Sequence, residues 1–293
     1  SVLGGAAEYG VADAGLFFEH LQGKPLVLLA QIFQHSPLVL ATHADSHLET
    51  PQDLAGKRIM FDKKNYSNVP VMAMLKNALG SLDSIQADEY SYSLDEFIDG
   101  EVDAVAVYLT SQAFTLKNNG LNINILNPRH YGIDFYGDNL FTTQKEVIEN
   151  PQRVANVIRA TLKGWRYALE HRDEIIQLIL SKYDTRMSRE ELEYEAKITD
   201  LMIVKDLIPV GTISPRRYLN IANIYTQAGL LEASADWSRY IYRPGVSDSS
   251  GAKLDRLQLT QQEKSWLLQH PVIRVMNGPD NPPYDFIKNG KPS

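Results

Sequence analysis

LVLLAQIFQHSPLVLAT, residues 26–42, is the stretch on which the fold prediction depends. Two apolar runs in it flank the polar tripeptide Gln34-His35-Ser36, and runs of this length bounded by polar residues are typical of buried strands. Strand-like and helical patterns then alternate along the chain, as at residues 57–79 and 102–117. This alternation predicts an α/β fold with a largely parallel sheet.

The other expected elements follow from the same patterns. Asp13 suits the N-cap of a helix, and Pro70 stands at a favoured first-turn position of another. We expect strands at residues 9–12, 26–33, 37–42, 57–61, 84–90 and 102–108, and helices at 13–22, 70–79, 94–99 and 111–117. From residue 144 onward the pattern is mainly helical, with a helical segment expected at 151–183 that is interrupted near residues 171–173, and helices expected from Ser188 and at 215–228.

Composition excludes several classes of function. The 293 residues carry a formal net charge of -7, which argues against a nucleic-acid partner because phosphate binding needs a basic face. Cysteine is absent, and this removes disulfides, thiolate metal sites and cysteine nucleophiles. There is no apolar run long enough to span a membrane and no export signal at the N-terminus. The chain is therefore expected to be cytosolic or to be part of a longer protein.

The sequence predicts two domains joined by a linker. Residues 1–243 form the first, and residues 244–258 are polar, small and unpatterned, as linkers are. Residues 259–293 contain an expected helix at 260–269, a strand at 272–276 and a turn at 289–290. So short a segment cannot bury a core alone, and we expect it to be the start of a domain that continues past Ser293.

Residues 1–244 resemble type II periplasmic solute-binding proteins. The motifs that carry this resemblance are GAAEYGV at 5–11, DLAGKRI at 53–59 and GEVDA at 100–104. IFQHSP at 32–37 and YGIDFYGDN at 131–139 resemble the branch related to thiamine pyrimidine synthase and its pyrimidine-binding relatives. The resemblance implies two α/β lobes with a ligand between them, and it implies that the N-terminal part of the first lobe is missing before Ser1.

Residues 259–284 resemble the opening of a family 3 extracellular solute-binding domain, of the kind found in bacterial sensor kinases and diguanylate cyclases. This second resemblance implies the sensory region of a membrane-bound receptor. The region would be periplasmic, as part of an inner-membrane protein, tethered through parts outside this chain, and the full-length receptor could be a dimer. The alternative is the substrate-binding component of an ABC importer for a pyrimidine or thiamine precursor.

In a two-lobed fold of this kind the ligand lies at the carboxyl ends of strands and near helix N-termini. The candidate ligand-binding residues at such places are Asp13, Phe33, Gln34, His35, Asn65, Tyr66, Ser67, Tyr108, Asp134, Tyr136, Asp138 and Asn139. The aromatic members could stack on a flat heterocycle. The carboxylates would favour an amine or an amino-substituted ring, so the expected ligand is a small nitrogen heterocycle such as a thiamine-related pyrimidine.

Each candidate also has a plain structural alternative. Asp13 could be only a helix N-cap, and Asp134 and Asp138 could serve only the turn in which they stand. A single aromatic residue is more often part of a core than of a site. His43 and His47 have the spacing of a metal pair, but they lie on a polar connection without helical periodicity. We therefore expect no metal site.

An enzymatic function has to be considered because the resembled branch includes a synthase. That synthase needs a lysine for pyridoxal phosphate, a histidine and a cysteine-rich iron motif. On alignment these positions fall on Ala12, Leu16 and residues 132–136, none of which supplies the required group. We therefore expect a binding module without a cofactor and without catalysis in this region. Any kinase or cyclase activity would lie outside it.

Overall fold

The computed structural model describes residues 2–88, 93–183, 187–231, 237, 239–243 and 265, and the strand residues 280–281, 285–288 and 291–292. The chain divides into two compact units, Ser1–Ser247 and Asp248–Ser293. The first unit contains two sheets and the helices around them, and these form two lobes.

The first lobe is built on a three-stranded antiparallel sheet. Its strands are β1 (Gly10–Ala12), β8 (Gly137–Thr143) and β2 (Leu26–Phe33), in the order β1-β8-β2. Every residue of β2 is buried, because its side chains enter a hydrophobic cluster on each face of the sheet. Leu28 enters one cluster, and Val27 and Leu29 enter the other, as the twofold period of a strand requires.

The helices of this lobe are α1 (Gly15–Leu21), α5 (Gln144–Glu149), α6 (Pro151–Glu170), α7 (Arg172–Lys182) and α8 (Arg189–Ile203). Four of them pack against the sheet, and α7 packs against α6 and α8. Helix α6 is amphipathic, and Val154, Ile158 and Leu162 recur along one of its faces at helical spacing. This face packs against the cluster that contains Val27 and Leu29. None of the described helices is both long enough and apolar enough to cross a membrane.

The second lobe is built on a five-stranded mixed sheet in the order β5-β4-β6-β3-β7. The strands are β3 (Leu38–His43), β4 (Arg58–Met60), β5 (Gln86–Asp88), β6 (Ala104–Tyr108) and β7 (Ile123–Leu126), and the helices are α2 (Val69–Leu79), α3 (Asp95–Ile98) and α4 (Gln112–Asn118). Phe97 of α3 and Leu116 of α4 share a core with Val39 and Val105, and α2 belongs to the separate core that also holds Leu40. Short 3-10 helices occupy Ala44–Ser46, Pro51–Leu54, Tyr66–Asn68, Leu82–Ser84 and Pro128–Tyr131.

The α/β prediction is confirmed, but the expectation of a largely parallel sheet is wrong. Strand β4 runs parallel to β5 and β6, whereas β3 runs antiparallel to β6 and β7, and both pairings of the first-lobe sheet are antiparallel. The reason lies in the path of the chain between the lobes. The chain enters the second lobe through β3 and leaves it through β7, so these two neighbouring strands run in opposite directions. The same holds for β2 and β8.

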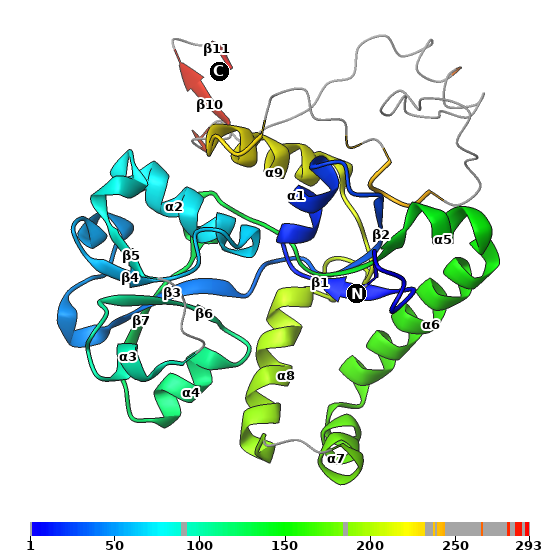
Figure 1. Cartoon of the computed structure of the whole chain (residues 1–293), viewed down its shortest axis with the longest axis horizontal. Helices are drawn as coiled ribbons and strands as arrows, with labels where there is room; N and C mark the ends of the chain where they lie inside the picture. The colour runs from blue at the N-terminus through cyan, green and yellow to red at the C-terminus, as the bar shows by residue number, and fades with distance from the viewer. Residues whose placement is uncertain are drawn as a thin grey trace. The chain divides into compact units, whose positions relative to one another are not determined.

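Two connections therefore cross between the lobes, residues 34–37 and residues 127–136. They lie against each other, because the Ser36 amide donates to the Phe135 carbonyl at 2.8 Å. Figure 1 shows the elements of the two lobes as separate groups, with α2 to α4 in one and α5 to α8 in the other.

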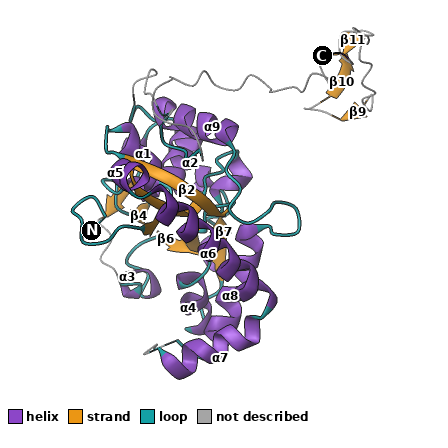
Figure 2. Ribbon diagram, turned by 90° about the vertical axis from the view of Figure 1, so that its right-hand side faces the viewer, coloured by secondary structure: helices purple, strands orange, loops and turns teal. Residues whose placement is uncertain are grey.

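A last helix of the first unit, α9 (Pro215–Gln227), touches both lobes. The Tyr225 hydroxyl donates to the Ala14 carbonyl at 3.0 Å, and the Lys76 ammonium on α2 donates to the Ala228 carbonyl at 3.2 Å. Figure 2 shows α9 close to α1 and α2, at the end of the unit away from α7 and α8. After α9 the chain returns to β2, where the Leu28 amide donates to the Tyr240 carbonyl at 2.6 Å.

The second unit is described only in part. Strands β9 (Asp280–Asn281), β10 (Asp285–Lys288) and β11 (Lys291–Pro292) pair antiparallel in the order β11-β10-β9. The pairing of Lys288 with Lys291 brackets the turn predicted at 289–290, which itself lies outside the described residues. The predicted linker at 244–258 and the strand at 272–276 lie outside them as well, as does the helix at 260–269 apart from residue 265, which is helical.

Candidate functional site

Asp13 is the side chain at which the two lobes meet. It stands between β1 and α1, and its Oδ1 accepts hydrogen bonds from the Gly15 amide at 3.0 Å and from the Ser67 hydroxyl at 2.7 Å. Its Oδ2 accepts one from the Tyr108 hydroxyl at 3.3 Å. Ser67 and Tyr108 belong to the second lobe, so the predicted cap of α1 also joins the lobes. The N-cap position itself is occupied by Ala14, one residue later than predicted.

Gly15 lets the lobes come together at this point. A Cβ atom on Gly15 would lie 3.2 Å from both the amide nitrogen and the hydroxyl oxygen of Ser67. A larger residue would therefore push the second lobe away from the start of α1. Glycine at the first position of the helix follows from this close approach.

A cavity of about 430 Å³ opens beside Asp13, which is a suitable volume for a small ligand. Leu16, Leu26 and Phe141 form an apolar part of its wall, whereas Asp13, Asn65 and Ser67 line it with polar groups. Four of the predicted site residues, Asp13, Asn65, Tyr66 and Ser67, are thus brought to one cavity. They come from both lobes.

Within this group Asn65 and Tyr66 also have local roles. The Asn65 side chain is exposed and accepts a hydrogen bond from the Ser67 amide at 3.0 Å. The Tyr66 ring is half-buried against Phe18 of α1, with 3.8 Å between the ring centroids. Tyr66 is therefore a contact between the lobes.

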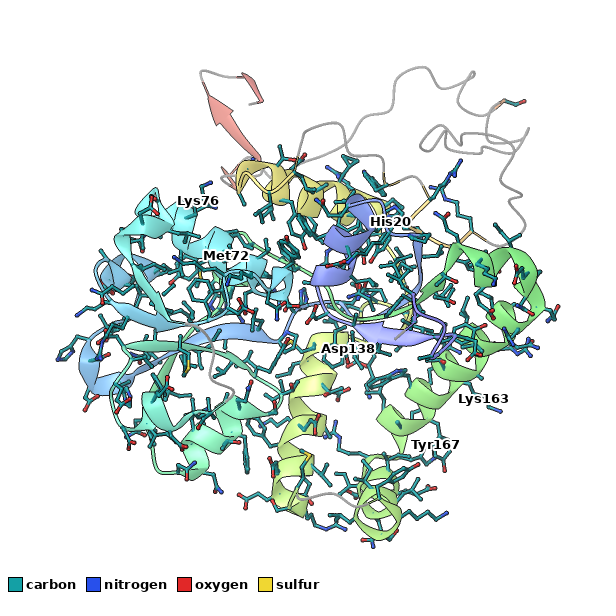
Figure 3. The ribbon with its side chains drawn as sticks, in the orientation of Figure 1. His20, Met72, Lys76, Asp138, Lys163 and Tyr167 are labelled. Carbon is teal, nitrogen blue, oxygen red and sulfur yellow. The ribbon has the colours of Figure 1, made fainter. Side chains whose placement is uncertain are left out.

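Asp138 is the second carboxylate at the lobe junction. It is half-buried at the start of β8 and has a left-handed φ of 45°, which asparagine and aspartate tolerate better than most residues. Burial raises the pKa of Asp138, and the charge of Asp13 raises it further. No described residue forms a hydrogen bond or ion pair with Asp138. Figure 3 shows it between the elements of the two lobes.

Asn139, the next residue, is buried and fixes the backbone that carries Asp13. Its Nδ2 donates to the Ala12 and Asp13 carbonyls, both at 2.8 Å. Its Oδ1 lies 3.0 Å from the Tyr218 hydroxyl, which comes from α9. Asn139 thus holds the backbone of Asp13 in place, and it does not line the cavity.

Helix α8 adds two residues that the sequence did not single out. Tyr194 contacts Phe114 of α4 with 4.9 Å between ring centroids, which is a further contact between the lobes. Burial raises the pKa of Glu195, and the charges of Glu191 and Asp138 add to the effect. Nothing in the local sequence distinguishes Glu195 from the other glutamates of this helix, so only the fold could have identified it.

The remaining candidates lie at the two connections between the lobes. Phe33 is buried in the core of the first lobe, 5% exposed. Gln34 is buried and donates from Nε2 to the Thr212 carbonyl at 3.1 Å. His35 donates from Nδ1 to Asp134 Oδ1 at 2.8 Å. Tyr136 is buried, its hydroxyl accepts from the Ser214 amide at 3.3 Å, and burial raises its pKa. These residues hold the connections together and do not line the cavity.

The histidine pair is not assembled as a metal site. His43 donates from Nε2 to the Phe97 carbonyl at 2.7 Å, and its ring stacks on Phe97 at 4.3 Å. His47 is exposed in a left-handed turn, with φ of 57°. In the part of the chain that the structure describes, no three histidine, aspartate or glutamate side chains form a metal-binding group.

The groups at the lobe junction are suited to hydrogen bonding with a ligand. They are the carboxylates of Asp13 and Asp138 and the hydroxyls of Ser67 and Tyr108. Of these, Asp13 and Ser67 line the cavity, whose wall also carries the charged residues Glu19, Lys24 and Lys64. Ionised carboxylates only accept hydrogen bonds, whereas hydroxyls donate and accept. Such a set complements a ligand that carries several N–H groups.

Comparison with solved structures places the fold. The chain is similar to the alkanesulfonate-binding protein SsuA of Xanthomonas axonopodis pv. citri, with a TM-score of 0.66 at 17% identity over 83% of this chain and 82% of that one. It is also similar to the periplasmic aliphatic sulphonate-binding protein SsuA of Escherichia coli, with a TM-score of 0.64 at 18% identity over 89% of this chain and 82% of that one. The predicted two-lobed α/β fold of periplasmic binding proteins is confirmed by this likeness.

Sequence comparison identifies the family. A formylaminopyrimidine-binding protein of Halalkalibacterium halodurans is 25% identical over 168 residues, which are 55% of this chain and 49% of that protein. The chain thus spans about half the length of this curated relative. Residues 1–175 match the family described as NMT1/THI5 like. These residues include both strands of the opening stretch, Asp13, Asp138 and the two connections between the lobes, and the chain belongs to the NMT1/THI5-like family.

Proposed function

We propose that the first unit binds a small, amino-substituted nitrogen heterocycle, a pyrimidine, between its two lobes. The proposal rests on the placement of two half-buried carboxylates, Asp13 and Asp138, at the lobe junction. Among the residues that the structure describes, none forms a hydrogen bond or an ion pair with Asp138. A buried carboxylate without a partner is costly unless a ligand supplies hydrogen bonds or positive charge. An aminopyrimidine supplies both when its ring is protonated.

The named relative supports the same class of ligand, since it is described as formylaminopyrimidine-binding. An aminopyrimidine presents N–H donors along one edge and a flat face above and below. Asp13 and Asp138 would accept from the edge, in place of the Ser67 and Tyr108 hydroxyls that Asp13 now holds. The rings of Tyr66 and Tyr108 are half-buried beside these groups and could stack on the face.

Binding of this kind depends on pH in a defined direction. Because burial raises the pKa of Asp138, this carboxyl takes up a proton at a higher pH than an ordinary aspartate does. The neutral form attracts a protonated amine less and presents a donor where an acceptor is needed. For a ligand whose charge stays the same over this range, affinity should therefore fall as the solution is acidified, and the fall should begin above the usual aspartate range.

The proposal can be tested by calorimetry and thermal unfolding with formylaminopyrimidine and 4-aminopyrimidine, and with an aliphatic sulphonate as the comparison ligand. A pyrimidine at a hundred times its dissociation constant should stabilise the fold by about 2.7 kcal/mol. Loss of one charge-assisted hydrogen bond, worth roughly 1.5–3 kcal/mol, should weaken binding about 10-fold to 100-fold in Asp138→Asn and in Asp13→Asn.

Asp206→Asn is the matched control, because Asp206 is exposed and has no described hydrogen bond or ion pair. Asp138→Asn is the more informative variant, since removing its charge breaks no described contact and should leave the fold intact. Stabilisation by the sulphonate without stabilisation by either pyrimidine would refute the proposed ligand class. Equal affinities for the wild type and Asp138→Asn would refute the proposed site.

For the cellular role we propose an extracytoplasmic, periplasmic binding region. The receptor context is supported by residues 259–284, which resemble the opening of a second solute-binding domain. The importer component is the alternative, and the relatives' names, which describe binding proteins, fit either role. Sequencing the reading frame on both sides separates them. A membrane-spanning segment followed by a kinase or cyclase domain supports the receptor, whereas a stop codon after the second domain supports the importer component.

We propose binding without catalysis for this region. The positions that would carry the synthase's lysine and histidine are Ala12 and Leu16, and Leu16 is buried in the core at 5% exposure. Neither side chain can form a Schiff base or supply a ring nitrogen. Incubation with pyridoxal phosphate, iron and oxygen should yield no pyrimidine product by mass spectrometry, and detection of turnover would contradict this part of the proposal.

A further inference from the structure

Arg217 contacts both connections that cross between the lobes. It lies in the first turn of α9, and its Nη2 donates to the Gln34 carbonyl at 2.6 Å while its Nη1 donates to Gln34 Oε1 at 3.3 Å. On the other connection, Nη2 is 3.1 Å from Asp134 Oδ2, and the guanidinium lies 3.9 Å from the centroid of the Tyr136 ring. One side chain thus holds residues a hundred or more positions apart in the sequence.

The surroundings make these contacts effective. The side chain of Arg217 is 24% exposed, that of Asp134 35% and that of His35 13%, so the group is only partly screened by solvent. Asp134 is shared, because its other oxygen accepts from His35 of the first connection at 2.8 Å. A planar guanidinium can bind a carbonyl and a carboxylate and stack on a ring at the same time, which the lysine ammonium cannot do.

The position of Arg217 is not explained by the stability of its own helix. The helix dipole places partial positive charge at the N-terminus, so a cation in the first turn is unfavourable there. Arg216, its neighbour in the same turn, is exposed and has no described hydrogen bond or ion pair. The two arginines therefore lie in the same turn of α9 but differ in their contacts.

We propose that Arg217 is the positioning residue of the interlobe hinge, which fixes the angle between the lobes by holding the two crossing connections against the start of α9. Closure of a two-lobed protein changes the backbone dihedrals of a few residues in such connections. Arg217 binds the backbone of one connection and the carboxylate and ring of the other, so opening the lobes requires these contacts to shift. This inference concerns lobe motion alone and holds whatever ligand the site takes.

Pulsed electron spin resonance between the lobes tests the proposal on the full chain. The protein has no cysteine, so Lys117→Cys on α4 and Lys163→Cys on α6 provide the only two labelling sites. Both lysines are exposed, one on each lobe, and Figure 3 shows Lys163 on α6. Arg217→Met keeps much of the side-chain volume and removes the charge and all four contacts, and Arg216→Met is its matched control.

In Arg217→Met the interlobe distance distribution should move to longer, more widely spread distances, with the ratio of open to closed molecules rising about tenfold, as expected for loss of a charge-assisted hydrogen bond. Arg216→Met should leave the distribution unchanged. Arg217→Lys should lie between the parent and Arg217→Met, because it keeps the charge without the planar fork. Thermal unfolding of each variant separates this effect from a general loss of stability, which would lower the melting temperature without moving the distance.

An Arg217→Met protein that folds and gives the parent distribution overturns the proposal, as does an equal shift in Arg216→Met. If Arg217→Met does not fold, Asp134→Asn provides the same test, because it removes the charge of one of the groups that Arg217 holds. A longer distance in Asp134→Asn supports the hinge role, and an unchanged one overturns it. Failure of both pyrimidines to bind would leave these outcomes unaffected.

Discussion

Replacement of Glu146 by glutamine should destabilise the protein in a way that depends on pH. The Glu146 side chain is 8% exposed and accepts hydrogen bonds from Arg153 Nε and Nη2, both at 2.6 Å, from the Tyr9 hydroxyl at 2.7 Å and from Asn150 Nδ2 at 3.0 Å. The bonds from Arg153 are the main cause that lowers the pKa of Glu146 from 4.5 to about 2, against the opposing effect of burial. Glu146→Gln removes the charge that these donors share.

The magnitude follows from the pKa. A fall from 4.5 to about 2 corresponds to about 3 kcal/mol of stability at 1.36 kcal/mol per pH unit. The Arg153 side chain is 49% exposed, so screening by solvent reduces the expected effect to roughly 1.5 kcal/mol. Because the folded state binds this proton less readily than the unfolded state, the contribution is fully present above pH 4.5. It is lost progressively as the pH falls toward 2.

Urea unfolding followed by circular dichroism, repeated at several pH values from 7 down to 3, measures this difference. The gap in unfolding free energy between the wild type and Glu146→Gln should be largest at pH 7 and should narrow below pH 4.5. Glu149→Gln on the same helix is the control, because Glu149 is exposed and has no described partner. A gap that stays constant across the pH range, or one equal to that of the control, would refute the reasoning.

Two further predictions concern the core and the backbone. Tyr218→Phe removes a buried hydroxyl that donates to a side-chain amide oxygen at 2.8 Å, and it should cost about 1–3 kcal/mol in urea unfolding, whereas Tyr183→Phe at an exposed position should be neutral. Gly211→Ala should destabilise by about 2 kcal/mol or more, because Gly211 has φ of 95° and a Cβ atom would lie 2.6 Å from a side-chain carbon of α6. Gly164→Ala, within α6 and in open space, should instead stabilise by about 0.5–1 kcal/mol, and thermal unfolding should show opposite shifts for these two alanine variants. Equal effects in either pair would contradict the corresponding explanation.

Local sequence patterns were sufficient for most single elements. The strand predicted at 26–33 is β2 with the same bounds, and the helix predicted at 70–79 is α2, which begins one residue earlier. Ser188 is the N-cap of α8, as expected from its side chain and the glutamates that follow it. Strand β8 was missed because Gly137 and Asp138 at its start look like turn residues, and its pairing partners are distant in sequence.

The candidate site was predictable only in part, for a physical reason. Asp13 and Ser67 could be placed near a ligand because each stands next to the start of a helix, and the structure brings them together. The sequence could not show that Gln34 and Tyr136 lie outside the cavity. The residues around a polar or aromatic side chain at a connection between the lobes do not reveal whether that side chain faces a cavity or another chain segment. Arg217 carried no signal of its own, because its partners come from two distant segments.

The path of the chain through the two lobes bears on how the protein folds during synthesis. The second lobe is one uninterrupted stretch, from β3 to β7, and its first and last strands are neighbours, with Leu40 opposite Leu126. On the ribosome it can be completed before β8 has been made. The first lobe must wait, because its sheet pairs Phe33 with Gly137, and the Gln31 side chain donates to the Gly137 carbonyl across 106 residues. Closing so long a loop in an unfolded chain is entropically costly, but a folded second lobe already holds the two ends together. The order of synthesis therefore favours folding of the second lobe first, and the first lobe is then assembled on it.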